Sequence, residues 1–417
     1  MYLDLPERDL DAIRLPMLGR VVATNGIVPW VVLDAAGQPV DAIQRYLRDF
    51  KARGNSAGSV RSYAYDLHRW WRFLAAVDVA WDAATSQDVC DFVLWIQSAS
   101  KVRKHARTKS AATAGTINPV TRKRYQDDKY LPSTVRHSNA VLRSFYDFWI
   151  EIGEGPLVNP VVRERVAGRR PNAHHNPLQP FRAEGRLRYN PKLPKRRPRE
   201  MPEERWRDLF GSMRSNRDRA ILALAISTAA RASELLGMVG ADVDWGDQLI
   251  RVRRKGSGAE QWLPTSPEAM VWLRLYLNDI GGAGPNDPVW WTIRRRRSGA
   301  EAQLDRRPLN YEALRAVLRR VNEELGANWS MHDARHTAAK RMARDEDLSL
   351  RDVQVILGHA ELTTTQIYLE QDDAEVIARV REHLAGPGSA KTGPAVPAAG
   401  YQAADLDVLF GGGRHAG

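Results

Sequence analysis

A proline-rich and arginine-rich segment, residues 155–199, divides this chain in two. Proline fixes φ and has no N–H to donate, so a helix cannot run through much of this segment. Its prolines include Pro171, Pro177, Pro180, Pro191, Pro194 and Pro198. The segment is also longer than the connections usually found within a compact domain. We therefore expect two folded domains joined by a basic interdomain linker.

The part before the linker has a helical pattern. From Ala42 to Phe50 apolar residues recur at steps of three and four, which places them on one face of a helix. The same reasoning predicts four helices in all, at 40–50, 60–74, 89–96 and 133–150. We assign residues 39–154 to one all-α domain. The N-terminal extension, residues 1–38, has mixed character and one strand-like stretch at 27–33.

The part after the linker mixes helical and strand patterns. Residues 249–253 and 261–264 are typical of two strands joined by a glycine-containing turn. Ser349 and Asp352 predict a capping box before another helix, and Gly358 ends it. Further helices are expected at 267–277, 311–325, 334–344 and 374–383. Residues 200–386 therefore form an α+β domain, and the fold class is mainly α with a small antiparallel β-sheet. The Gly-, Ala- and Pro-rich residues 387–417 are expected to be a flexible tail.

The charge of the chain indicates a polyanionic partner. The 62 Lys and Arg against 50 Asp and Glu give a net charge of +12, and neutralising phosphates releases condensed counterions. An anionic membrane surface would attract the same charge. However, no apolar run approaches the roughly 18–20 residues of a membrane span. The N-terminus lacks the layout of a secretion signal, and the single cysteine, Cys90, suits a reducing cytoplasm.

Two basic segments are candidates for contact with DNA. The loop between the third and fourth predicted helices has no acidic residue from position 101 until Asp127. It is either a solvated insertion or a loop that follows the phosphate backbone. The second segment is the linker. The candidate residues are Lys101, Arg103, Lys104, Arg122, Lys123, Arg124, Arg196 and Arg197.

Three short motifs of the second domain together have the groups needed to cleave a phosphodiester. They are T-A-A-R-A-S-E around Arg231, H-D-A-R-H-T from His332, and L-G-H followed by T-T-Q-I-Y, which ends at Tyr368. A phenol can attack phosphorus, and guanidinium groups stay charged and offer a rigid fork of donors. His332 lies one helical turn before Arg335, so both side chains can face one phosphate.

With these motifs the chain resembles the tyrosine recombinase (phage integrase) family. The resemblance implies that Tyr368 is the nucleophile and forms a 3′-phosphotyrosine link. Arg231 and Arg335 would bind the phosphate, and His332 would assist proton transfer. Ala229, Ala230 and Ala334 depart from the usual family pattern, because they stand beside the two arginines where T-G-L-R and H-D-L-R are common.

The resemblance also supplies the remaining roles. Lys255, in R-R-K-G-S-G, matches the lysine that protonates the 5′ leaving oxygen, and His359 matches a residue that hydrogen-bonds the phosphate. Glu234 matches an acidic residue that orients the first arginine. The helical domain resembles the SAM-like core-binding domain of the family.

The function implied is that of a site-specific DNA recombinase of the integrase or transposase type. It would act as a homotetramer on double-stranded DNA recombination sites of a mobile element, without ATP, metal or other cofactor. Two alternatives stay open: a type IB topoisomerase-like strand transferase, and a DNA-binding regulatory protein that does not cut. A zinc site at His332 and His336 is disfavoured, because aspartate replaces the glutamate of H-E-x-x-H and no third ligand follows.

Overall fold

The computed structural model describes residues 8–101, 112–165, 184–193, 200–293, 296–298, 303–359, 362–366, 368 and 381. The chain divides into two compact units between residues 196 and 197, and residues 322–329 group with the first unit. No helix among the described residues has the length and apolar character required to cross a bilayer.

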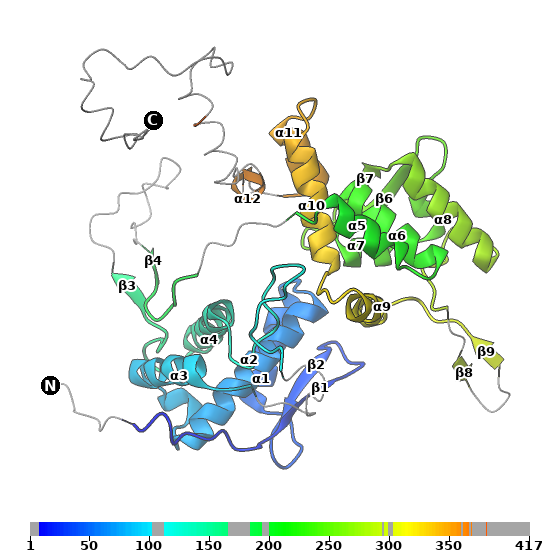
Figure 1. Ribbon diagram of the computed structural model, residues 1–417. Helices are drawn as coiled ribbons and strands as arrows, with labels where there is room; N and C mark the ends of the chain where they lie inside the picture. The colour runs from blue at the N-terminus through cyan, green and yellow to red at the C-terminus, as the bar shows by residue number, and fades with distance from the viewer. Residues whose placement is uncertain are drawn as a thin grey trace, which may run out of the picture. The chain divides into compact units, whose positions relative to one another are not determined.

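The first unit is built on the four predicted helices (Figure 1). Each is longer than its apolar pattern by between one and five residues, because capping and polar residues extend helix ends beyond the buried face. The predicted strand at 27–33 is shorter in the structure and pairs antiparallel with a strand that the sequence did not indicate. The elements are β1 (Arg20–Ala23), β2 (Trp30–Leu33), α1 (Asp41–Ala52), α2 (Ala57–Ala76), η1 (Trp81–Ala83), α3 (Ser86–Ser98), α4 (Pro132–Glu151), β3 (Arg163–Arg165) and β4 (Glu184–Leu187).

Aromatic side chains fill the core of this unit. Trp70 of α2 is fully buried and donates from its indole nitrogen to the hydroxyl of Tyr146 on α4 at 2.9 Å. Tyr146 in turn donates to the carbonyl of Trp81 at 2.8 Å. Buried Tyr and Trp need such partners for their polar atoms, so these bonds fix how α2 and α4 pack.

Residues 8–39 pack against this helical core. The β1–β2 hairpin contacts α2. Arg72 of α2 donates to the carbonyl of Pro16 at 2.6 Å, and Trp95 of α3 donates to the carbonyl of Ile13 at 3.3 Å. The described part of the N-terminal extension is therefore held by backbone–side-chain hydrogen bonds.

The second unit surrounds one buried helix, α6 (Asn216–Thr228), which packs against α8 on one side and α10 on another. Apolar residues occur around its whole circumference, as expected for a central helix. The other elements are α5 (Glu203–Gly211), α7 (Ala232–Leu236), η2 (Gly240–Asp242), β5 (Val243–Asp244), β6 (Leu249–Arg253), β7 (Glu260–Pro264), α8 (Pro267–Ile280), β8 (Arg296–Ser298), β9 (Gln303–Asp305), α9 (Tyr311–Glu324), α10 (Met331–Arg344), α11 (Leu350–Leu357) and α12 (Leu362–Gln366).

The sheet and the helix ends that position the candidate site follow the sequence closely. The predicted hairpin is present as β6 and β7, and β5 adds a third antiparallel strand that the sequence did not indicate. Helix α10 begins at Met331 and not at 334, because Ser330 and Asp333 cap it. His332 therefore lies in its first turn. The capping box of Ser349 with Asp352 is present. The helix expected at 374–383 and the tail 387–417 lie outside the described residues, apart from Arg381.

Candidate active site

A buried carboxylate, Glu234, organises the cationic residues of the second unit. It is 3% exposed. One carboxylate oxygen accepts from the backbone N–H of Arg231 at 2.9 Å, and the other accepts from the Arg231 guanidinium at 2.8 Å. The backbone N–H of Lys255 and the guanidinium of Arg254 also donate to it, each at 3.2 Å. Burial alone would raise the pKa of Glu234, but these hydrogen bonds and the charge of Arg254 lower it.

Arg335, from the middle of α10, is held by the main chain. It donates to the carbonyl oxygen of Ala229 at 2.6 Å and to that of Leu357 at 2.8 Å. Its side chain is buried, and no carboxylate within the described residues pairs with it directly. Burial, followed by the charge of Arg231, lowers the pKa of Arg335 to about 10. The guanidinium is thus fixed in place by peptide carbonyls, and no direct partner in the described ranges neutralises its charge.

Ala229 reaches this position through a strained backbone. It is the C-cap of α6, with φ at 52°, in the left-handed region that favours glycine. This conformation turns the chain so that Arg231 follows directly at the N-cap of α7. Ala229 stands where the family pattern T-G-L-R has glycine. This substitution therefore falls in the turn whose carbonyl accepts from Arg335 and which leads to Arg231.

His359 lies beside Arg335. The guanidinium donates to Nε2 of His359 at 3.3 Å, and Nδ1 lies 2.9 Å from the hydroxyl of Thr365. Because a guanidinium only donates, Nε2 must be the unprotonated nitrogen, and Nδ1–H donates to Thr365. Burial, followed by the charges of Arg335, Arg231 and Arg254, lowers the pKa of His359 to about 4.

Tyr368 enters the same site from the same chain. It is 5% exposed, and its ring stacks near that of His359 with centroids 6.4 Å apart. Burial raises the pKa of its hydroxyl, whereas the charges of Arg335 and Arg231 act in the opposite direction. The structure therefore places the predicted nucleophile within the field of both predicted clamp arginines.

The histidine that contacts Tyr368 is not the one that the motif suggested. Nδ1 of His336 lies 2.9 Å from the Tyr368 hydroxyl, with ring centroids 5.6 Å apart. His332 is exposed, and its ring meets that of His336 edge-on at 4.1 Å. We predicted His332 as the proton-transfer residue and considered His336 only as a metal ligand. The i, i+4 spacing in H-D-A-R-H was the available signal that both face one side of α10.

A second residue that sequence reasoning missed is Arg254. It is 5% exposed and donates to Glu234, to the side chain of Gln261 at 2.8 Å and to the carbonyl of Ile356. Gly358, with φ at 61°, makes room for it: a Cβ at that position would lie 2.8 Å from Nε of Arg254. Arg254 thus ties the hairpin to the end of α11, next to His359.

Lys255 occupies the predicted hairpin turn. Its backbone is anchored to Glu234, as described above, and its side chain is exposed. In the part of the chain that the structure describes, its ammonium group has no hydrogen-bond or ion-pair partner. The structure therefore places Lys255 at the edge of the cationic cluster, with its amine in solvent.

The candidate DNA-contacting residues are only partly described. Arg103, Lys104, Arg196 and Arg197 lie outside the described residues. Lys123 donates to the carbonyl of Asn328 at 3.0 Å, and Arg124 donates to the carbonyl of Gly115 at 2.7 Å. Arg122 is exposed, with φ at 55°. Residues 116–125 thus form a hydrogen-bonded turn, so this described part of the predicted loop is folded.

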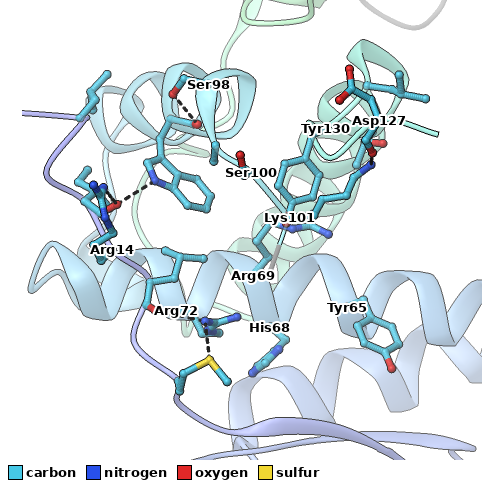
Figure 2. A pocket seen from close by; sticks show the side chains of 18 of the residues that line it. Arg14, Tyr65, His68, Arg69, Arg72, Ser98, Ser100, Lys101, Asp127 and Tyr130 are labelled. Atoms are coloured by element: carbon cyan, nitrogen blue, oxygen red, sulfur yellow. Dashed lines mark hydrogen bonds between the residues drawn. The ribbon is translucent and has the colours of Figure 1, made fainter. Parts of the chain in front are cut away.

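A groove also lies on the surface of the first unit. It has a volume of about 1260 Å³ and runs between residues 10–21 and helices α2 and α3. Figure 2 shows Arg14, Arg69, Arg72 and Lys101 around it, together with Tyr130. The guanidinium of Arg69 lies 4.8 Å from the Tyr130 ring centroid. The groove is therefore both cationic and aromatic.

Comparison with known proteins identifies the family. The model of the phage integrase family matches residues 201–375, and that of the phage integrase N-terminal SAM-like domain matches residues 43–117. Tyrosine recombinase XerC of Azotobacter vinelandii is 30% identical over 249 residues, which cover 55% of this chain and 80% of that protein. The chain belongs to the tyrosine recombinase family.

Other members of the family match over a shorter span. Tyrosine recombinase XerC of Chromobacterium violaceum is 32% identical over 189 residues, 44% of this chain and 60% of that protein. The chain thus spans less than two thirds of some of the curated relatives that it matches.

Solved recombinase structures share the fold. The Tn1549 transposon integrase (residues 82–397), in complex with circular intermediate DNA, aligns with a TM-score of 0.51 at 14% identity, covering 81% of this chain and 98% of that one. A lambda integrase (75–356) dimer bound to a COC′ core site aligns with a TM-score of 0.50 at 14% identity, covering 86% and 98%.

Proposed function

We propose that this protein is a site-specific DNA recombinase that cleaves and rejoins strands through a 3′-phosphotyrosine intermediate. The observation that carries the proposal is the convergence of Arg231, Arg335, His359 and Tyr368 on one site of a single chain. Among the described residues, the guanidinium groups of Arg231, Arg254 and Arg335 outnumber Glu234, the buried carboxylate that pairs with two of them, so the site favours an anion. Membership of the tyrosine recombinase family supports a phosphodiester as that anion.

In the proposed reaction the cationic groups hold one backbone phosphate. The guanidinium groups of Arg231 and Arg335 stabilise the charge that develops on its non-bridging oxygens, and such preorganised donors are a large part of catalysis. Tyr368 attacks phosphorus, so the tyrosyl O–P bond forms while the P–O5′ bond breaks. Lys255 is the proposed acid for the departing 5′ oxygen, and its exposed amine leaves it free to reach bound DNA.

We also propose the arrangement of the whole protein on DNA. The SAM-like helical domain (39–154) and the catalytic domain (200–386) would bind duplex DNA, with the linker 155–199 between them. The cationic groove of the first unit, which includes Lys101 and Arg124, offers a surface for the phosphate backbone. Four protomers would join two duplexes, as in recombination of a mobile element. Because the phosphotyrosine link conserves bond energy, neither ATP nor metal is needed.

Covalent trapping tests this proposal even while the recombination site is unidentified. Duplexes with a nick in a random-sequence region are incubated with the wild-type chain and with Tyr368→Phe. The wild type should retain DNA in SDS, while Tyr368→Phe should retain none although it retards the same duplexes on native gels. An adduct formed by Tyr368→Phe would refute the nucleophile. Binding without any adduct from the wild type would favour a non-cutting regulatory protein.

Duplexes that carry the captured sequence can then distinguish recombination from relaxation of supercoiled DNA. Two duplexes that carry the captured site should yield strands joined between them. If the protein only relaxes supercoiled plasmid and never joins two duplexes, the topoisomerase-like alternative is favoured instead.

A further inference from the structure

The residue that faces the nucleophile is His336, which none of the roles above uses. Its Nδ1 lies 2.9 Å from the Tyr368 hydroxyl, within the range of a good O–H···N hydrogen bond. Both side chains are largely removed from water, since Tyr368 is 5% exposed and His336 is half-buried. Attack by Tyr368 requires that its proton leave, and His336 is the group placed to receive it.

We infer that His336 is the base for Tyr368: its Nδ1 takes the phenolic proton as the tyrosyl oxygen bonds to phosphorus. This role rests on the proposed function. The P–O5′ bond breaks in the same step, and the 5′ oxygen receives its proton from Lys255. In rejoining, the 5′ hydroxyl attacks phosphorus and its proton returns to Lys255, while the imidazolium returns its proton to the departing Tyr368 oxygen. Protons and charges balance in both directions without any other reactant.

The alternative base is His332, which precedes Arg335 by one turn. Its ring contacts His336 edge-on, and its side chain is exposed. The hydrogen bond to the Tyr368 hydroxyl that the structure gives is made by His336. The two histidines are one turn apart on α10, so exchange of their roles would require Tyr368 to move by about 6 Å along the helix.

The surroundings of His336 suit a proton acceptor. Among the described residues, His332 on the same helix and Tyr368 contact His336, and Lys340 follows one turn further along α10. Arg335 and Arg231 act on Tyr368, where their charges favour the phenolate. These charges favour loss of the hydroxyl proton, and Nδ1 of His336 lies within hydrogen-bond distance to accept it.

The direct test needs no DNA. In ¹⁵N-labelled full-length protein, the imidazole nitrogens of His336 are assigned by comparison with His336→Asn. The expected neutral form has Nδ1 unprotonated and Nε2 protonated, and Tyr368→Phe should change the Nδ1 shift. A proton on Nδ1 in the neutral form would overturn the inference, because that nitrogen could not then accept from the phenol.

The kinetic test uses a nicked duplex captured by the wild type. His336→Asn keeps a polar atom near the position of Nδ1 but cannot act as a base at neutral pH. Its cleavage should be slower by on the order of 10²–10⁴-fold. The variant rate should also rise more steeply with pH than the wild-type rate, because without the base it depends on ionisation of the Tyr368 phenol, whose pKa is raised by burial. An unchanged rate and pH profile would overturn the assignment.

A sulfur substrate separates the base from the acid. When the bridging 5′ oxygen is replaced by sulfur, the leaving thiolate needs no proton. Cleavage by Lys255→Ala should recover on this substrate, and cleavage by His336→Asn should not. Recovery of His336→Asn would place His336 on the acid side and overturn the inference. A wild type that forms no adduct with any duplex would instead count against the proposed function itself.

Discussion

Arg335 and Ala229 are joined by a 2.6 Å hydrogen bond from the guanidinium to the backbone carbonyl. This bond connects α10 to the left-handed turn at the end of α6, and Arg231 follows that turn by two residues. A second carbonyl, that of Leu357, holds the other side of the same guanidinium. The proposed clamp arginine is therefore positioned by peptide groups, which orient it without neutralising its charge.

Arg335→Lys should consequently lose most of the activity although it keeps the charge. A lysine cannot satisfy both carbonyls in the fork geometry of arginine, and a missing transition-state donor costs about 10²–10³-fold in rate. The measurement is single-turnover adduct formation on a captured nicked duplex. Arg341→Lys, on the same helix and in an exposed ion pair with Glu203, is the control and should cleave normally. Equal rates for the two variants would contradict the proposed role.

Glu234 should be a large contributor to the stability of the second unit. Glu234→Gln removes the only carboxylate among the described residues that pairs with Arg231 and Arg254. Breaking a buried pair costs about 3–5 kcal/mol in the free energy of unfolding, measurable by urea denaturation. Glu260→Gln, which removes an exposed partner of Arg251 and Arg253, should cost at most about 1 kcal/mol.

Glu234 also predicts how the free energy of unfolding depends on pH. Because folding lowers the pKa of Glu234, its contribution is present above the pKa of an unfolded glutamate, about 4.3, and is lost as the pH falls through the folded value. The difference in unfolding free energy between wild type and Glu234→Gln should therefore shrink below about pH 4.3. A difference that stays constant down to pH 3 would show that the carboxylate charge is not responsible.

The sequence predicted the parts of the fold that depend on local rules. The four helices of the first unit, the β6–β7 hairpin and the capping box at Ser349 all follow from periodicity, turn residues and capping. The resemblance to the family then gave Arg231, Arg335, His359 and Tyr368 as one constellation, and the structure brings these residues together.

What the sequence did not indicate depends on tertiary packing. His336 was not chosen, because the helical phase of H-D-A-R-H allows either histidine to face the tyrosine, and only the fold decides between them. Arg254 has a local signal that we did not use. It continues the buried phase of β6 after Ile250 and Val252, which are 0% and 1% exposed. An arginine in a buried strand phase needs an anion, and here that anion is Glu234.

His359 should titrate far below an ordinary histidine in the free protein. Its pKa is lowered to about 4 by burial and by the charges of Arg335, Arg231 and Arg254. An anion in the site should raise that pKa, because it opposes those charges. Histidine NMR titrations with and without sulfate, assigned with His359→Asn, measure both values. Sulfate suits this test, since its charge stays constant over the titration. A pKa near 6.5 without sulfate would contradict the cationic character of the site.

Gly358→Ala should be more damaging than its small size suggests. Gly358 has φ at 61°, where an L-residue costs roughly 1–2 kcal/mol, and its added Cβ would lie 2.8 Å from Nε of Arg254. Displacing Arg254 would disturb its bond to Glu234, so cleavage should fall together with stability.

Gly281→Ala is a matched control: this residue also ends a helix in the left-handed region, with φ at 82°, but has no atom within 4 Å of its Cβ position. The control should lose only the unfolding free energy that the backbone strain costs, and it should cleave at the normal rate. Equal unfolding free energies and cleavage rates in the two variants would show that the contact between Gly358 and Arg254 does not support the site.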